Sequence, residues 1–408
     1  MGEATRDFRE RKGSEGMAEK STDSSATPLL YFGDTYRHPD IYHAIRFLAP
    51  DPQIVLQRGD EIVLLTNSLE EGRARKQSRA TTIENIDAYG AREFNTTMGP
   101  PITDAVATIV QRFLEGHGAR RVRVPQAFPL ALADLLRAKG IDLVVAEGLE
   151  ARRRTKRADE IEALAATQRA TEEAWQLGVD AIARSSPGPD RVLRLDGAAL
   201  TAERVRAIVE GALLERGCLA ESTIIAPGPQ AADPHMSGSG PLHAGEPVVM
   251  DIFPQHKETR YFADMTRTVS KGAPAAEIVK MYEVVMRAQD AGIKALRPGI
   301  TGREVHELVE DIIFAAGYDT LRSGQKHRPD DPVARGFIHG TGHGVGLEIH
   351  EAPSIGRGGA SPLQVGDVVT VEPGIYDPDI GGVRLEDMLV ITVDGSRNLT
   401  HAPRQLVV

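Results

Sequence analysis

Two similar segments that each end on a carboxylate are the strongest chemical signal in this sequence. Segment 241–251 (PLHAGEPVVMD) and segment 362–372 (PLQVGDVVTVE) align without a gap, with proline, leucine, glycine and the terminal acid at one offset. Each segment is followed by a second strand-like segment that carries another acid. The four acidic residues are Asp251, Asp264, Glu372 and Glu386. A carboxylate in an apolar strand is costly to bury without a cation or hydrogen bonds, so four converging acids predict bound cations.

Histidines gather in a glycine-rich segment just before the second copy. Three of them, His339, His343 and His350, occur within twelve residues. The glycines permit close backbone approach, and imidazole is a common metal ligand. Four carboxylates with one imidazole suit two divalent cations held roughly 3.5–4 Å apart by bridging carboxylates. Because such cations lower the pKa of a bound water, the pattern predicts a two-metal hydrolase.

Two helices are expected before each copy. The first pair comprises 159–184 and a helix that follows Thr201, and the second comprises 275–296 and a helix that begins at the capping box of Thr301 and Glu304. We therefore expect a duplicated unit with a pseudo-two-fold axis, in which each half donates one hairpin and two carboxylates.

The 408 residues exceed what one hydrophobic core usually organises, so two domains are expected. Residues 1–27 have few large apolar side chains and are interpreted as a disordered tail, in which Met17 is a second possible start. Residues 28–150 alternate between strand and helix patterns, which predicts a layered α/β domain. Residues 151–408 form the expected catalytic domain, and the basic run 152–157 is interpreted as a linker that is either solvated or the start of a helix. In the first domain the expected strands are 54–57, 62–65, 121–124 and 141–146, and the expected helices are 103–115 and 129–138.

Composition excludes several classes of function. A net charge of -10 disfavours a nucleic-acid-binding protein, because such binding rests on clustered Lys and Arg. The single cysteine, Cys218, is interpreted as a structural thiol, since it has no partner for an intramolecular disulfide. No apolar run approaches the roughly 18 residues of a membrane span, and no signal core is present at the start. These features favour a cytoplasmic protein without a membrane partner.

The blocks that carry these residues, HGTGHG, EPGIY and VRLED, resemble those of the creatinase/prolidase/methionine-aminopeptidase superfamily, also called the pita-bread or M24 family. The resemblance extends from about Lys156 to the C-terminus. It implies an α/β N-terminal domain followed by an α+β pita-bread catalytic domain with an internal pseudo-two-fold duplication. It also implies five ligands for two metal ions, with Asp264 and Glu386 bridging both, Asp251 completing one site, and His343 with Glu372 completing the other.

The same resemblance implies roles for further polar residues. His235 is similar to a substrate-facing histidine near the scissile bond, and His350 to one that stabilises the tetrahedral intermediate. His339 and Arg384 are similar to groups that line the proline-side pocket. We expect Glu372 to accept a proton from the attacking water and pass it to the leaving nitrogen.

The extra N-terminal domain favours the Xaa-Pro branch, which comprises aminopeptidase P and Xaa-Pro dipeptidase (prolidase), with short proline-containing peptides as substrates and a homodimer as the expected assembly. The choice between the two activities stays open. Mn²⁺ is the expected ion, and Co²⁺, Zn²⁺ or Fe²⁺ would also suit the ligands. The alternatives are a hydrolase like methionine aminopeptidase or creatinase, and a non-catalytic interaction protein of this fold. The segment 251–260 departs from the family pattern, because the usual Asp-x-Gly with a short turn is replaced by a longer loop.

Overall fold

The computed structural model describes residues 27–323 and 335–408, so nearly all of the expected N-terminal tail lies outside the described residues. The chain divides into two compact units. The first contains the described residues up to Asp34 together with Ala44–Glu147, and the second contains Thr35–His43 and Gly148–Val408. The segment Thr35–His43 therefore belongs to the second unit although it precedes most of the first in sequence. Within the described ranges, no helix has the length and apolarity needed to span a membrane.

A mixed six-stranded sheet with the order β4-β3-β2-β1-β5-β6 forms the first unit. Its strands are β1 (Leu29–Gly33), β2 (Gln53–Arg58), β3 (Glu61–Thr66), β4 (Thr82–Asn85), β5 (Arg121–Val124) and β6 (Asp142–Val145). Its helices are α2 (Glu71–Gln77), η2 (Ile86–Tyr89), α3 (Asp104–Gly116) and α4 (Leu130–Ala138), while α1 (Pro39–Ile45) begins in the second unit. The strands β1 to β3 pair antiparallel, and β4, β5 and β6 join the sheet by parallel pairing. The expected strands and helices of this region are all present, and the α/β prediction is confirmed.

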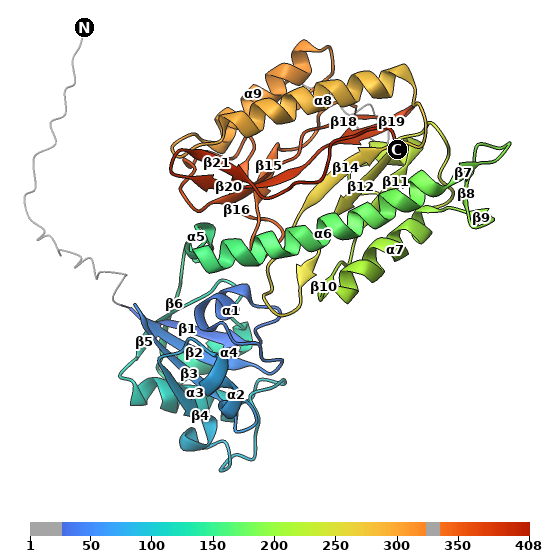
Figure 1. Cartoon of the computed structure of the whole chain (residues 1–408). Helices are drawn as coiled ribbons and strands as arrows, with labels where there is room; N and C mark the ends of the chain where they lie inside the picture. The colour runs from blue at the N-terminus through green and yellow to red at the C-terminus, as the bar shows by residue number, and fades with distance from the viewer. Residues whose placement is uncertain (1–26, 324–334) are drawn as a thin grey trace, which may run out of the picture. The chain divides into compact units, whose positions relative to one another are not determined.

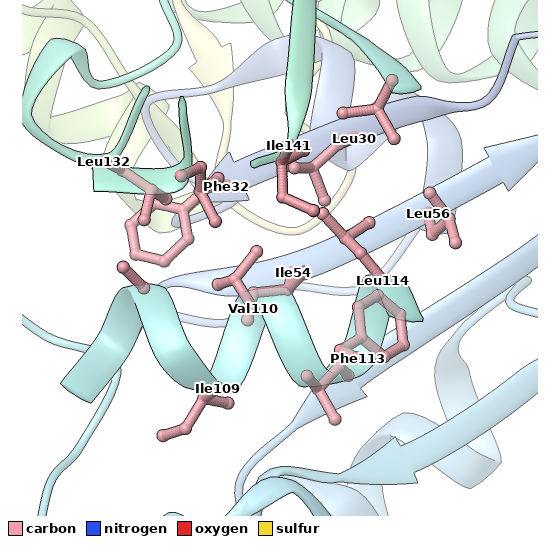
Figure 2. Close-up of a cluster of buried hydrophobic side chains, with 14 of the residues drawn as sticks. Leu30, Phe32, Ile54, Leu56, Ile109, Val110, Phe113, Leu114, Leu132 and Ile141 are labelled. Carbon is pink, nitrogen blue, oxygen red and sulfur yellow. The ribbon is translucent and has the colours of Figure 1, made fainter. Parts of the chain in front are cut away.

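The core of the first unit lies between this sheet and helix α3 (Figure 2). Val110, Phe113 and Leu114 recur at helical spacing on one face of α3 and pack with Ile54 and Leu56 of β2. All five side chains are buried, and each contributes roughly 1.5–3 kcal/mol of burial free energy.

Two helix pairs and two main sheets form the second unit. The helices are α5 (Ala151–Arg154), α6 (Ala158–Arg184), α7 (Ala202–Glu215), α8 (Ala276–Ala295) and α9 (Gly302–Ala315), with short turns η3 (Gly228–Ala232) and η4 (Leu321–Ser323). One sheet has the order β11-β12-β14, formed by Ile224–Pro227, Val248–Ile252 and Met265–Val269. The other has the order β16-β15-β17-β20-β21, formed by Glu351–Ile355, Gly342–Gly344, Val368–Val371, Asp387–Thr392 and Gly395–Asn398. Smaller sheets comprise β7 (Ser186–Pro187) with β8 (Leu193–Leu195) and β9 (Ala198–Ala199), β10 (Cys218–Leu219) with β13 (Gln255–His256), and β18 (Gly374–Asp377) with β19 (Gly381–Arg384).

The expected duplication is visible in the order of these elements. In each half two helices that pack together precede an antiparallel strand pair, α6 and α7 before β12 and β14, and α8 and α9 before β17 and β20. Figure 1 shows the strands between the two helix pairs. A glycine marks the same packing point in each half. A Cβ on Gly178 of α6 would lie 2.8 Å from Val209 of α7, and one on Gly292 of α8 would lie 3.0 Å from Val309 of α9.

Two local expectations are revised by the structure. The basic run 152–157 is not a solvated linker, because Arg153 and Lys156 are buried in ion pairs and the Arg154 side chain is only 11% exposed. The alternative of a helix start agrees better, since Ala151–Arg154 forms α5 and Arg157 is the N-cap of α6. Within the longer loop that follows Asp251, Gln255–His256 form the short strand β13, in which His256 pairs with Cys218 of β10. Cys218 is buried, as expected of a structural thiol.

Candidate metal centre

A cavity of about 510 Å³ in the second unit is lined by every residue for which the sequence predicted a catalytic, substrate-binding or metal-binding role. These residues are His235, Asp251, Asp264, His339, His343, His350, Glu372, Arg384 and Glu386. Apolar side chains complete part of the wall, among them Ile224, Phe253, Ile338 and Ile349. Of the loop after β12, Phe253 lines the cavity, whereas residues 255–260 are not among its described lining residues.

The first half of the duplicated unit supplies Asp251 and Asp264. Asp251 lies in β12 opposite Thr266 of β14, and Asp264 directly precedes β14. Arg384 Nη2 donates a hydrogen bond of 2.7 Å to Asp251 Oδ2. The other oxygen, Asp251 Oδ1, is buried and has no hydrogen-bond partner among the described residues. A buried carboxylate oxygen without a partner is costly, and a cation in the cavity would provide one.

The second half supplies Glu372 and Glu386. Glu372 directly follows β17, and Glu386 lies between β19 and β20. Buried threonines support both carboxylates. Thr266 Oγ1 donates to Glu386 Oε2 at 2.7 Å, and Thr370 Oγ1 donates to Glu372 Oε1 at 3.3 Å. These bonds orient the carboxylates toward the cavity.

His343 lies in β15 between acids of both halves. Its Nε2 is 3.3 Å from Glu372 Oε1 and 3.5 Å from Asp264 Oδ2. Its Nδ1 lies 3.1 Å from the carbonyl oxygen of Gly344, a contact that places the proton of the neutral ring on Nδ1. Nε2 faces the acids, which keep the ring protonated in the absence of a cation, and a cation bound at Nε2 would replace that proton. Three of the predicted ligands are close enough to hold one metal ion, because one ligand atom from each of Asp264, His343 and Glu386 lies within 4.8 Å of the other two.

The electrostatics of the centre also fit bound cations. Burial raises the pKa of Asp264 and of Glu386 well above the usual range, and repulsion from the neighbouring carboxylates raises both further. Burial opposes ionisation of Glu372 as well, yet the hydrogen bond and charge of His343 lower its pKa to about 2. Burial disfavours the imidazolium form of His343, but Glu372 and Asp264 raise its pKa to about 9. The acids thus repel one another unless positive charge lies between them, and the donor set suits divalent cations.

A hydrogen-bonded chain runs along one side of the cavity. Arg384 Nη1 donates to the hydroxyl oxygen of Tyr376 at 2.9 Å, and that hydroxyl lies 2.8 Å from His339 Nε2. His339 Nδ1 lies 2.7 Å from the carbonyl oxygen of Gly340. Burial lowers the pKa of His339, so the ring is neutral, with Nδ1 donating to Gly340 and Nε2 accepting from Tyr376. Both ring nitrogens of His339 are therefore occupied.

His350 and His235 lie at the same cavity with fewer constraints. The His350 ring meets the His343 ring edge to face, with centroids 4.3 Å apart. Burial and the charge of His343 lower the pKa of His350, which keeps its imidazole neutral near pH 7. His235 is exposed, and its backbone N–H donates to Asp233 Oδ1 at 3.1 Å. The structure brings these histidines to the predicted centre, and their catalytic roles stay predictions.

Sequence reasoning missed three residues that shape the site, namely Thr266, Thr370 and Tyr376. Tyr376 is the tyrosine of the EPGIY block, and the sequence motif alone assigns it no role. Thr266 and Thr370 each lie two residues from a predicted ligand in sequence, a spacing that puts side chains on one face of a strand. This two-residue spacing is the signal in the sequence that points to Thr266 and Thr370.

Comparison with known proteins identifies the family to which this fold belongs. The family model of metallopeptidase family M24 matches residues 161–393, which include all five predicted ligands. The chain belongs to metallopeptidase family M24.

Individual relatives extend this result. An uncharacterized peptidase, YqhT, of Bacillus subtilis is 40% identical over 186 residues, and an Xaa-Pro dipeptidase of Pyrococcus furiosus is 38% identical over 186 residues. Each alignment covers 45% of this chain and 48–49% of the relative, so the chain matches about half the length of these curated relatives. The prolidase of Pyrococcus horikoshii OT3 superposes with a TM-score of 0.72 at 26% identity, covering 94% of this chain and 96% of that one. An X-Pro aminopeptidase of Thermotoga maritima MSB8 superposes with a TM-score of 0.76 at 23% identity, covering 94% and 98%. The predicted pita-bread fold with an additional N-terminal domain is confirmed.

Proposed function

We propose that this chain is a two-metal peptidase that hydrolyses Xaa-Pro bonds in short peptides. The observation that carries the proposal is the convergence of four carboxylates and His343 on one cavity whose remaining wall holds His350, His339 and Arg384. Relatives named Xaa-Pro dipeptidase and a neighbouring structure named prolidase support this choice of bond.

The five ligands are proposed to divide between two sites, with Asp264 and Glu386 shared, Asp251 completing one, and His343 with Glu372 completing the other. The bound cations would polarise the scissile carbonyl and lower the pKa of the attacking water. Mn²⁺ is the proposed ion because four of the five ligands present oxygen. Competition between Mn²⁺, Co²⁺, Zn²⁺ and Fe²⁺ for metal-free protein, measured by calorimetry and activity, tests that choice.

Proton transfer is assigned to Glu372. Its carboxylate is ionised at neutral pH and lines the cavity, so we propose that one oxygen accepts the proton of the attacking water. The same oxygen then delivers the proton to the nitrogen that leaves as the bond breaks. His350, which lines the same cavity and packs against the His343 ring, is proposed to donate a hydrogen bond to the developing oxyanion.

Selectivity for proline follows from the character of the leaving group. The nitrogen of an Xaa-Pro bond carries no hydrogen, so the site needs a shaped pocket rather than a partner for an N–H. Both ring nitrogens of His339 are already engaged, and His339 and the apolar Ile338 both line the cavity, so we propose that they form part of such a pocket. Arg384 holds this wall through Tyr376.

A matched substrate set tests the proposal. Metal-stripped protein is assayed with and without Mn²⁺ on Ala-Pro, Ala-Pro-Ala, Met-Ala-Ser and creatine, with His343→Ala as the control variant. Metal-dependent cleavage of Ala-Pro alone identifies a dipeptidase, and cleavage of the tripeptide as well identifies an aminopeptidase P. Release of methionine or turnover of creatine instead would contradict the Xaa-Pro assignment. An inactive protein that still binds metal would contradict the peptidase proposal.

The assembly and compartment are proposed separately. We propose a homodimer and a cytoplasmic location, in keeping with the family resemblance and the composition of the chain. Light scattering after size-exclusion chromatography measures the first, and fractionation of the producing cells measures the second.

A further inference from the structure

A buried cluster of charges lies beside His350. Arg153 contacts three carboxylates, with Nη1 2.8 Å from Glu351 Oε2, Nη2 2.5 Å from Glu348 Oε2, and Nε 2.7 Å from Asp40 Oδ1. Lys156 Nζ lies 2.6 Å from the second oxygen of Glu351. The side chains of Arg153, Lys156 and Glu351 are 5%, 1% and 3% exposed and are shielded from water, whereas the Glu348 side chain is 50% exposed.

The cluster holds the chain on both sides of His350. Glu348 lies two residues before that histidine and Glu351 one residue after it, and a single guanidinium bonds to both. The Glu351 carboxylate also covers Gly346, where a Cβ would lie 2.2 Å from Glu351 Oε1. The loop from Gly346 to Glu351 is thus closed on itself and tied to Arg153.

The ring of His350 has no comparable restraint of its own. Among the residues that the structure describes, no hydrogen bond reaches its imidazole, and its one ring contact is the edge-to-face packing on His343. Its direction therefore depends on the backbone of the loop that carries it. Charged hydrogen bonds that are shielded from water are strong and directional, which suits the buried Arg153–Glu351 pair to holding that backbone, with the half-exposed Glu348 as a second contact.

We propose that Arg153 and Lys156 position His350 by clamping Glu348 and Glu351, so that the imidazole is aimed at the reacting carbonyl. The proposal rests on the peptidase function proposed above. It makes Arg153 and Lys156 positioning residues, since neither lines the cavity among the described residues. In this proposal the basic run before α6 has a structural role in the second unit.

The segment Thr35–His43 extends the clamp. Asp40 comes from this segment, which belongs to the second unit, and its side chain is 27% exposed. Burial alone would lower the pKa of the Arg153 guanidinium, but Glu351, Asp40 and Glu348 together raise it. Arg153 is therefore charged at neutral pH. We expect Asp40→Asn to weaken the clamp less than loss of Arg153, because the two loop contacts remain.

Substitution of Arg153 tests the clamp against a matched neighbour. Arg153→Met removes all three contacts, and Arg153→Lys retains a charge but not the bidentate geometry. Arg154→Met is the control, because Arg154 also makes a buried pair, with Nη2 2.7 Å from Asp367 Oδ2, but at a turn remote in sequence from His350. For each Mn²⁺-loaded variant we would measure kcat and KM for Ala-Pro, Mn²⁺ affinity, and the thermal midpoint. Hydrogen exchange of residues 345–350 would be measured in the metal-free protein.

For Arg153→Met we expect kcat to fall by about 10²-fold, as for a catalytic group displaced by about 1 Å, with KM and Mn²⁺ affinity changed by less than about threefold. Exchange in 345–350 should rise at least about tenfold, a rise that the control should not show. Arg153→Lys should recover part of both effects. Arg154→Met should lower the thermal midpoint similarly while kcat stays within about threefold of wild type. Equal losses of kcat in the two methionine variants, or unchanged exchange in 345–350, would overturn the clamp.

The exchange measurement also separates this inference from the proposed function. If the wild-type protein hydrolyses no proline peptide, the peptidase proposal fails, whereas increased exchange that is specific to Arg153→Met still supports a clamp on the His350 loop. If the wild-type protein is active but Arg153→Met matches it in kcat and exchange, the clamp fails and the peptidase proposal stands.

Discussion

The two halves of the duplicated unit share a framework but contribute different chemistry. The first half supplies Asp251 and Asp264, whereas the second supplies Glu372 and Glu386 together with all the histidines of the cavity other than His235. Nearly the same length of chain separates the two acids in each half, from 251 to 264 and from 372 to 386. In the first half this stretch forms the short strand β13 against β10, and in the second it forms the hairpin β18–β19.

The β18–β19 hairpin of the second half makes hydrogen bonds to strands of the first half. Arg384 in β19 donates to Asp251 of β12, and its backbone N–H and carbonyl both bond to Thr268 Oγ1 of β14. Thr266 of the first half supports Glu386 of the second in return. Duplication thus provides equivalent carboxylates, and divergence of one connecting segment provides the groups that orient them.

The largest expected effect tests the equivalence of Asp264 and Glu386, the two acids proposed to bridge the cations. Asp264→Asn and Glu386→Gln should each lower kcat for Ala-Pro by about 10³-fold or more, because each would remove a charge that the proposal shares between both cations. Metal content by mass spectrometry should fall in both variants. Full metal content and near-normal activity in one of them would show that the halves are not equivalent.

Loss of the cross-half contact should come next. Arg384→Met leaves Asp251 without its guanidinium and Tyr376 without its donor, so kcat/KM for Ala-Pro should fall by about 10²-fold. Arg335→Met is the control, since Arg335 pairs with Asp377 and Asp379 at the end of the same hairpin. A similar loss in both variants would mean that the hairpin, rather than the Arg384 contact, matters.

The effect of Asp264→Asn on the free energy of unfolding should change sign when the metal is removed. In metal-free protein, Asp264→Asn should raise unfolding free energy by about 1 to 2 kcal/mol, because it removes a buried charge that its neighbours repel. The folded-state pKa of Asp264 is raised, so the wild-type fold loses stability as pH rises from the usual carboxyl range through that raised value. The advantage of the variant should therefore grow with pH. Denaturant unfolding at several pH values, with and without Mn²⁺, measures it, and a lower stability of the metal-free variant would contradict the repulsion.

A matched pair of threonines should show a smaller difference between the halves. Thr266→Val and Thr370→Val each remove a hydroxyl that supports a ligand, and losses of metal affinity of about tenfold are expected. The loss should be larger for Thr266, whose bond to Glu386 is 2.7 Å, than for Thr370, whose bond to Glu372 is 3.3 Å. Calorimetric titration with Mn²⁺ measures both, and the opposite ranking would contradict this comparison.

The smallest effects are expected at the duplicated glycines. An alanine at Gly178 or Gly292 would crowd a valine of the next helix and a side chain of the strand below, Met250 or Val371. Each substitution should cost about 1 kcal/mol, because overpacking exceeds the gain in helix propensity. Similar shifts in denaturant midpoint would support matched packing, and a stabilised variant at one position would contradict it.

Much of the fold was predictable because its signals are local. The capping box of Thr301 and Glu304 correctly predicted the start of α9, and the boundaries of α6 and α8 lie within a residue of those expected. The repeated segments predicted the two halves correctly. The hairpin β18–β19 was not predicted, since Gly381 and Gly382 weaken its strand pattern. Tertiary packing requires a glycine at position 382, because a Cβ there would lie 2.0 Å from the carbonyl oxygen of Ala231 in η3.

The sequence alone determined which residues could hold cations, because an acid in an apolar strand and a histidine among glycines are costly unless they serve a site. It could not determine which groups hold those residues in place. Tyr376 joins Arg384 to His339, and Arg153 reaches Glu348 across 195 positions, only because the chain folds these segments together. Such long-range pairs leave no periodic signal in the sequence, and their geometry depends on distances that only the tertiary structure sets.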